Sequence, residues 1–189
     1  MKMDFIYKWI EHIPSDHSVG DAQIRELFKW ASTIDGNAVE IGSFYGRSTV
    51  VIGYGLKIGQ KGKVFAIDPH QNRYNSFIKC SEYISKTTCK EHIQIVRDLS
   101  ENVLKTKSPK EIFESPVNLL FIDGDHSYEG IKKDLNWIDV VPRGGVIILH
   151  DYSSKYPGII QAINEFRLQN PMVFEQIKLL GSMVIFRKS

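Results

Sequence analysis

The stretch VEIGSFYGRS, residues 39–48, decides the fold. It joins an apolar run, Ala38–Ile41, to a segment whose apolar spacing predicts a helix over about Arg47–Ile58. Gly42 and Gly46 stand four residues apart at the junction, where glycine lets the backbone adopt a positive φ and approach a ligand closely. The G-x-x-x-G spacing is not the dinucleotide fingerprint, and no Lys-Ser/Thr pair follows to make a phosphate loop. The stretch therefore predicts a strand, a turn and a helix, with the turn either binding a ligand or serving the structure alone.

Apolar runs and helical segments alternate along the rest of the chain. Four further runs are predicted strands, with helical segments between them: Val64–Ile67, Ile93–Val96, Val117–Ile122 and Val146–Leu149. Such alternation is typical of a parallel sheet with helices on both faces. The two final runs, Phe174–Leu180 and Met183–Arg187, lie too close together for a crossover helix and should pair antiparallel. We predict a Rossmann-like α/β sandwich of three layers, formed by one domain over residues 1–189 with a helical N-terminal preface over residues 1–35.

The composition carries no strong charge bias. The 189 residues are 42% hydrophobic and 24% charged, and the formal net charge is +2. This balance does not indicate a nucleic-acid or membrane-surface partner, and no apolar run approaches the roughly 18 residues that span a bilayer. Two cysteines, Cys80 and Cys89, do not make a disulfide framework and fit reduced thiols. We expect a cytoplasmic protein.

Acidic side chains recur at the ends of the predicted strands. Asp68, Asp98 and Asp123 each follow an apolar run closely, and His150 and Asp151 follow the fifth run. Ligands of parallel sheets bind beyond the carboxyl ends of the strands, so these side chains should gather around one site. An acid after the second strand can hold a ribose diol by two hydrogen bonds. For Asp68 and for Asp98, the alternative is a helix cap without a ligand.

The motif Glu40-x-Gly42-x-x-x-Gly46, together with Asp68, resembles the first motif and the ribose-binding acid of the class I S-adenosylmethionine-dependent methyltransferases. Residues 121–130, FIDGDHSYEG, and residues 150–152, HDY, look like methyltransferase family 24, the small-molecule O-methyltransferases related to macrocin O-methyltransferase. The resemblance implies a seven-stranded sheet with an antiparallel last strand, and S-adenosyl-L-methionine as the cofactor.

The resemblance also implies which residues hold the cofactor. The turn at Gly42 should face the methionine part, Asp68 the ribose and Asp98 the adenine, with His126 nearby. The implied cofactor-binding residues are Glu40, Gly42, Ser43, Phe44, Gly46, Ser48, Asp68, Asp98, Asp123 and His126.

Asp123, His150 and Asp151 form a candidate metal site. Their strands are neighbours in this fold, so the two carboxylates should meet, and they repel unless a cation or a proton lies between them. Oxygen ligands suit Mg²⁺ or Mn²⁺, whereas an imidazole favours transition metals. Related metal-dependent O-methyltransferases carry Asp-Asp or Asp-Asn at the second position, where this chain has His150-Asp151. This departure leaves open the alternative that the two acids only orient cofactor and loops.

The proposed chemistry is methyl transfer to the oxygen of a small hydroxylated molecule, such as a sugar or a natural-product intermediate. Asp125 and His126 are the candidate catalytic residues, with Asp125 first as general base and His126 and His150 as its rivals. The short preface predicts that a partner subunit of a homo-oligomer helps to cover the site. The alternatives are a cofactor-binding protein without methyl transfer, a metal-dependent hydroxylase-like relative, and a nucleic-acid methyltransferase, which the lack of a basic stripe with aromatics disfavours.

Overall fold

The computed structural model describes the chain except residues 1–3, 15–18, 72–73, 107–108 and 172–173. The strands are β1 (Asn37–Ile41), β2 (Val64–Ile67), β3 (Ile93–Val96), β4 (Val117–Ile122), β5 (Val146–Leu149), β6 (Phe174–Leu180) and β7 (Met183–Lys188). The α-helices are α1 (Asp4–Ile10), α2 (Asp21–Thr33), α3 (Arg47–Gly59), α4 (Ser76–Ser85), α5 (Ser100–Thr106), α6 (Pro109–Ile112), α7 (Tyr128–Asp134) and α8 (Pro157–Gln169). Short 3₁₀ helices are η1 (Lys90–His92) and η2 (Leu135–Val140).

The strands form one seven-stranded sheet in the order β3-β2-β1-β4-β5-β7-β6. The strands from β3 to β5 pair parallel to one another, with β1 between β2 and β4. β7 runs antiparallel to both β5 and β6, because only Gly181 and Ser182 separate it from β6 and leave room for nothing but a hairpin turn. The predicted seven-stranded sheet with a reversed last strand is confirmed.

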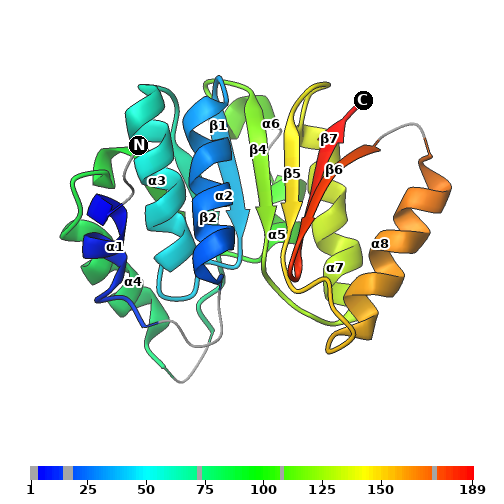
Figure 1. Ribbon diagram of the computed structural model, residues 1–189, viewed down its shortest axis with the longest axis horizontal. Coiled ribbons are helices and arrows are strands. Elements are labelled where there is room, and N and C mark those ends of the chain that lie inside the picture. Colours follow the sequence, from blue (N-terminus) through cyan, green and yellow to red (C-terminus); the bar gives the residue numbers. More distant parts are fainter. Residues whose placement is uncertain (1–3, 15–18, 72–73, 107–108, 172–173) are drawn as a thin grey trace.

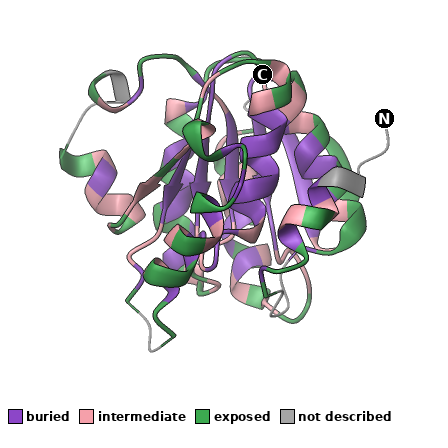
Figure 2. Ribbon diagram, turned by 90° about the vertical axis from the view of Figure 1, so that its left-hand side faces the viewer, coloured by how far each residue is buried: buried purple, intermediate pink, exposed green. Residues whose placement is uncertain are grey.

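Helices cover both faces of the sheet, which gives the predicted three layers (Figure 1). Successive residues of a strand point to opposite faces. In β1, Ala38 belongs to the apolar cluster that contains residues of α2 and α3, whereas Val39 and Ile41 belong to the cluster with α7 and α8. The central strands are therefore buried on both sides, as their colour in Figure 2 shows. Uninterrupted apolar runs are what strands between two helical layers require.

The N-terminal helices pack on α3. Ile6 of α1 and Leu27 of α2 are fully buried in the cluster that they share with α3. Arg47, the first residue of α3, donates hydrogen bonds from its guanidinium to the carbonyl oxygens of Ile10 (2.5 Å) and Ile13 (3.1 Å). These bonds fasten the end of α1 beside the turn that follows β1.

Both cysteines lie in the same apolar cluster as free thiols. Burial raises the pKa of Cys80 to about 12 and that of Cys89 to about 11. A thiol with such a pKa stays protonated at neutral pH, so both behave as small apolar side chains.

Two segments differ from the prediction. The apolar spacing of Ile131, Leu135 and Ile138 predicts a single helix over Tyr128–Ile138. The structure has α7 followed by the tighter helix η2, a common way for a helix to end, and Pro142 follows closely. The prolines near both ends of residues 108–116 predict a loop before β4. This segment contains the short helix α6, which begins at Pro109, a residue favoured at a helix start.

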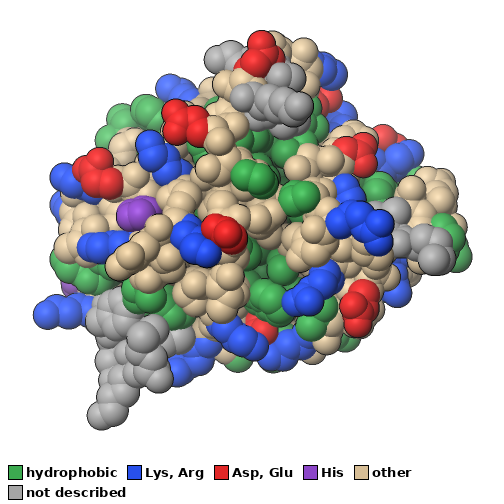
Figure 3. All heavy atoms as spheres, turned by 90° about the horizontal axis from the view of Figure 1, so that it is seen from above, with side chains coloured by type: hydrophobic (Ala, Val, Ile, Leu, Met, Phe, Trp, Pro, Cys, Tyr) green, Lys and Arg blue, Asp and Glu red, His purple; other side chains and the backbone are tan. Residues whose placement is uncertain are grey.

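The surface seen from above in Figure 3 carries basic side chains interspersed with acidic and apolar ones. It lies at the amino ends of the parallel strands, whose arrowheads point downward in Figure 1.

None of the helices in the described part of the chain is both long and apolar enough to cross a bilayer.

Candidate active site

The turn between β1 and α3 has no room for a side chain at two positions. Gly42 has a φ of +88°, and a Cβ there would lie 2.2 Å from the carbonyl oxygen of Asp123. Gly46 has a φ of +84°, and its Cβ would lie 2.9 Å from Sγ of Cys80. Phe44, between them, also adopts a positive φ of 44°, a conformation that costs a non-glycine residue about 1–3 kcal/mol. The turn therefore brings bare backbone from the end of β1 against the end of β4.

Asp68, just beyond β2, braces this turn. Its Oδ2 accepts hydrogen bonds from the backbone N–H groups of Ser43 (3.0 Å) and Phe44 (2.8 Å). Its Oδ1 accepts one from the N–H of His70 (2.7 Å). A carboxylate has about four acceptor positions, so Asp68 keeps capacity for a ligand hydroxyl while it holds the turn.

Glu40 lies fully buried beneath the turn. Its Oε2 accepts a hydrogen bond from Oγ1 of Thr49, on α3, and its Oε1 has no partner in the described structure. Burial raises the pKa of Glu40 to about 8, against hydrogen bonds from Ser48 and Thr49 that favour the ionised form. The negative charge of Asp123 raises this pKa further. Glu40 is thus a buried support of the turn.

A cavity of about 590 Å³ opens at the carboxyl ends of the parallel strands. The predicted site residues in its wall are Gly42, Phe44, Asp68, Asp123, Asp125, His126, His150 and Asp151. Those outside its wall are Glu40, Ser43, Gly46, Ser48 and Asp98. Six carboxyl side chains line the cavity, against two lysines and two histidines, and this excess of acidic groups suits a cationic ligand such as a sulfonium.

Asp123, His150 and Asp151 come together at the ends of β4 and β5, which pair directly. Nδ1 of His150 lies 3.1 Å from Oδ1 of Asp123 and 3.6 Å from Oδ1 of Asp151. One ligand atom from each of the three residues lies within 4.8 Å of the others. Asp151 has a φ of +56°, a strained backbone of the kind found at functional sites. The predicted juxtaposition of these residues is present.

The charges of this group are interdependent. Burial alone would lower the pKa of His150, but its contacts with Asp123 and Asp151 outweigh burial and raise it to about 9. Burial likewise opposes ionisation of Asp123, whereas its contacts with His126 and His150 hold its pKa below the ordinary value. An imidazolium can therefore act as the cation between the two carboxylates, and a divalent ion can replace its proton. Two carboxylates and one imidazole are a donor set that fits such an ion.

Asp125 and His126 are adjacent in sequence but differ in their surroundings. Asp125 is exposed, and its two oxygens accept hydrogen bonds of 2.9 Å from the N–H and the hydroxyl of Ser127. Nε2 of His126 lies 3.1 Å from Oδ2 of Asp151. Nε2 of His126 is thus engaged by a carboxylate. Both contacts of Asp125 are with neutral groups, so its oxygens keep the capacity to accept a proton.

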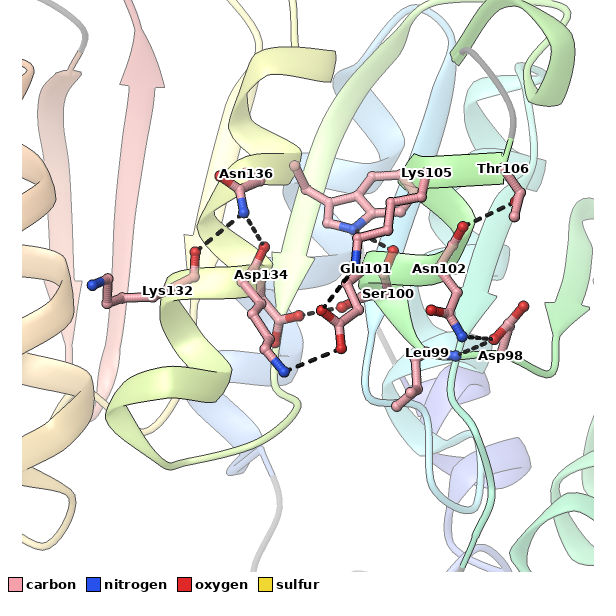
Figure 4. Close-up of polar contacts among 12 residues, drawn as sticks. Asp98, Leu99, Ser100, Glu101, Asn102, Lys105, Thr106, Lys132, Asp134 and Asn136 are labelled. Atoms are coloured by element: carbon pink, nitrogen blue, oxygen red, sulfur yellow. Dashed lines mark hydrogen bonds and ion pairs between the residues drawn. The ribbon is translucent and has the colours of Figure 1, made fainter.

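The sequence pattern does not predict the wall of the cavity between α5 and α7 (Figure 4). Oγ of Ser100 donates a hydrogen bond of 2.5 Å to Oδ1 of Asp134, and Nζ of Lys133 lies 3.1 Å from Oε1 of Glu101. Burial raises the pKa of Asp134 to about 6, against the hydrogen bond from Ser100. The only available signal is that Asp134 shares the apolar helix face with Ile131, where an acid is unexpected.

Asp98 caps α5. Its Oδ1 accepts hydrogen bonds from the N–H of Leu99 (2.7 Å) and from Nδ2 of Asn102 (2.9 Å), as Figure 4 shows. These contacts hold Asp98 against the segment that enters α5. Leu99 and Ser100 line the cavity, whereas Asp98 itself is not part of its wall.

Comparison with known proteins agrees with this geometry. A family model described as a methyltransferase domain matches residues 39–152, more than half of the chain. The O-methyltransferase from Bacillus cereus, solved in complex with SAH, shares 18% identity at a TM-score of 0.70 over 100% of this chain and 92% of its own. The O-methyltransferase NovP shares 16% identity at a TM-score of 0.67, over 90% and 81%. An rRNA methylase from Streptococcus thermophilus shares 16% identity at a TM-score of 0.63, over 90% and 97%. Likeness at such identities shows the fold alone.

The match to the family model spans most of the site. It contains the glycine turn, Asp68, the strand end at Asp123 and the pair His150-Asp151. The same residues surround the cavity at the carboxyl edge of the sheet, with Asp68 bracing the turn. The chain therefore belongs to methyltransferase family 24, and it is a class I S-adenosylmethionine-dependent methyltransferase.

Proposed function

We propose that this enzyme methylates a hydroxyl oxygen of a small molecule in the cavity at the carboxyl ends of the strands. The cofactor supplies an electrophilic methyl group on a sulfonium, and the protein must hold the acceptor oxygen in line with it. The observation that carries the proposal is the Asp125 carboxylate, which lines the cavity together with Asp123, His150 and Asp151. Transfer to a hydroxyl requires removal of a proton, and a carboxylate in the cavity wall is suited to accept it.

The cofactor would lie along the glycine turn. Gly42 and Phe44 would face its methionine part, and Asp68 would accept hydrogen bonds from the ribose diol. Asp123 and His126 would lie next to it at the end of β4. Behind the cavity wall, a second set of residues would shape the turn and the start of α5: Glu40, Ser43, Gly46, Ser48 and Asp98.

A divalent ion would be held by Asp123, His150 and Asp151. When bound, such an ion would supply Lewis-acid chemistry that lowers the pKa of an acceptor hydroxyl. Asp125, two residues from Asp123, would accept the hydroxyl proton. His126 would serve as a positioning residue, because its contact of 3.1 Å with Asp151 restrains that carboxylate.

The variant Asp125→Asn tests the proton acceptor. It should bind S-adenosylhomocysteine as the wild type does, by calorimetry, while turnover falls by about 10²–10⁴-fold, the usual contribution of a general base. Glu129→Gln is the matched control, since it removes an exposed carboxylate from the start of α7, and it should retain activity. Normal turnover by Asp125→Asn would exclude Asp125 as the base.

The acceptor class is tested with methyl-labelled cofactor. We expect label in hydroxylated small molecules, sugars and natural-product scaffolds among them, and none in RNA or DNA. Label in RNA would favour a nucleic-acid methyltransferase, and binding of the cofactor without labelled product across the panel would favour a protein that only binds it.

The predicted homo-oligomer is tested by light scattering, where a monomeric mass would contradict it.

A further inference from the structure

The side chain of Gln23 connects helix α2 to the site. Its Nε2 lies 3.2 Å from the carbonyl oxygen of Leu180 and 3.3 Å from Oγ of Ser182, both at the turn between β6 and β7. Its Oε1 accepts a hydrogen bond of 2.9 Å from the N–H of Gly20 and lies 3.3 Å from Nε2 of His150. One amide therefore contacts the start of α2, a distant hairpin and the imidazole of the candidate metal site.

These contacts fix the orientation of the amide. A backbone carbonyl can only accept a hydrogen bond, and a backbone N–H can only donate one. The amino group of Gln23 must therefore face Leu180, and its oxygen must face Gly20. The atom opposite Nε2 of His150 is that same oxygen, which can only accept.

The orientation of Gln23 determines where His150 carries a proton. Nε2 of His150 must be a donor, so in the neutral ring Nδ1 is left with the lone pair. Nδ1 is the nitrogen that faces the carboxylates of Asp123 and Asp151, at 3.1 and 3.6 Å. The His150 side chain is only 3% exposed, so the ring has little solvent available to it as an alternative partner for Nε2.

We propose that Gln23 is a positioning residue that keeps His150 protonated on Nε2, and that the resulting site of one imidazole and two carboxylates selects a transition-metal ion over Mg²⁺. This inference rests on the proposed metal site of the enzyme and narrows its choice of ion. Mg²⁺ prefers oxygen ligands in an octahedral arrangement, whereas imidazole suits ions such as Zn²⁺. A group that fixes the second nitrogen of a ligating histidine contributes about 10–100-fold to metal affinity.

Binding of Zn²⁺ and of Mg²⁺, each alone, to the full chain tests the proposal by competition with a chromophoric chelator. The wild type should prefer Zn²⁺ by on the order of 100-fold or more. Gln23→Met removes the acceptor and should weaken Zn²⁺ binding by about 10–100-fold with little effect on Mg²⁺. Gln23→Glu keeps an acceptor opposite Nε2 and should restore Zn²⁺ binding. His150→Asp, which supplies only oxygen ligands, should bring the two affinities closer together.

Nitrogen NMR of the histidine side chains gives a readout that a merely structural role would not move. In the Zn²⁺-loaded wild type, Nε2 of His150 should carry the proton and Nδ1 should not. A proton on Nδ1, equal affinity for the two ions, or Zn²⁺ binding by folded Gln23→Met that equals the wild type would overturn the proposal. If a thermal melt shows that Gln23→Met does not fold, the NMR spectrum of the wild type and the metal affinities of His150→Asp still test the proposal.

Calorimetry with S-adenosylhomocysteine separates this inference from the proposed function. A protein that binds S-adenosylhomocysteine but not Zn²⁺ refutes the metal inference alone. A protein that binds Zn²⁺ but no S-adenosylhomocysteine and transfers no methyl group refutes the proposed function instead.

Discussion

Replacing Glu40 by Gln removes a buried acid whose ionisation opposes folding. The pKa of Glu40 is about 8 in the folded protein, because of burial, against an ordinary value of 4.5. Folding therefore favours the protonated form, so this group's contribution to stability is fully present below pH 4.5 and is lost as the pH rises toward 8. At about 1.36 kcal/mol for each pKa unit, the wild type should lose about 3 kcal/mol of unfolding free energy between pH 5 and pH 7.5 on account of Glu40.

Urea unfolding of the cofactor-free protein at pH 5 and at pH 7.5 measures this loss of unfolding free energy. Glu40→Gln keeps an oxygen to accept the hydrogen bond from Thr49 and cannot ionise, so its stability should fall by about 3 kcal/mol less than that of the wild type over this interval. Glu175→Gln, a change of the same charge on exposed β6, should follow the wild type. Because groups remote from Glu40 titrate alike in all three proteins, the difference reports on Glu40 and the charges coupled to it, Asp68 and Asp123 among them. Parallel pH dependence of Glu40→Gln and wild type would refute the reasoning.

Three further predictions address the turn, the N-terminal helices and the cavity wall. Gly42→Ala should no longer bind S-adenosylhomocysteine in calorimetry and should lose several kcal/mol of unfolding free energy in urea, because the added Cβ would clash with the backbone of Asp123. Gly144→Ala is the control: Gly144 has a similar φ of +84° but lies in open space, so the variant should lose only about 1–2 kcal/mol. Arg47→Met should cost about 2–3 kcal/mol of unfolding free energy and should accelerate amide hydrogen exchange in α1 more than in the strands of the sheet. Equal acceleration in α1 and in the sheet would argue against a local role of Arg47 in holding α1. Asp134→Asn should flatten the pH dependence of the unfolding free energy between pH 4 and pH 6. Burial raises the pKa of Asp134 to about 6, so the stabilising contribution of its protonated form declines over that interval in the wild type. An unchanged pH dependence in the variant would show that folding does not oppose ionisation of Asp134.

The fold could be predicted because its strands are short apolar runs with clear ends. The run Val117–Ile122 is bounded by Pro116 and Asp123 and is buried on both faces, so no helical period competes with it. The split of the segment after Tyr128 into α7 and η2 could not be predicted, because the apolar spacing is compatible with either helix type.

Site residues at strand ends could be predicted and residues on helices could not. Asp68, Asp123 and Asp151 follow parallel strands, whose carboxyl ends share one edge whatever the helices do. Gln23 lies 127 positions from His150 in the chain, and its contact depends on how α2 packs on the sheet. Strand alternation places Glu40 on the same face as Ala38, toward α3, and its burial follows because helices cover both faces of β1.

The two inert cysteines give the protein a practical property for labelling. Maleimide and related reagents attack the thiolate, a form that neither Cys80 nor Cys89 offers at neutral pH. A new cysteine at an open surface position, such as Leu168 on α8, which is 80% exposed, would therefore be the one that takes up a fluorophore. Dyes or spin labels could be attached to the otherwise unaltered chain to follow cofactor and metal binding in solution.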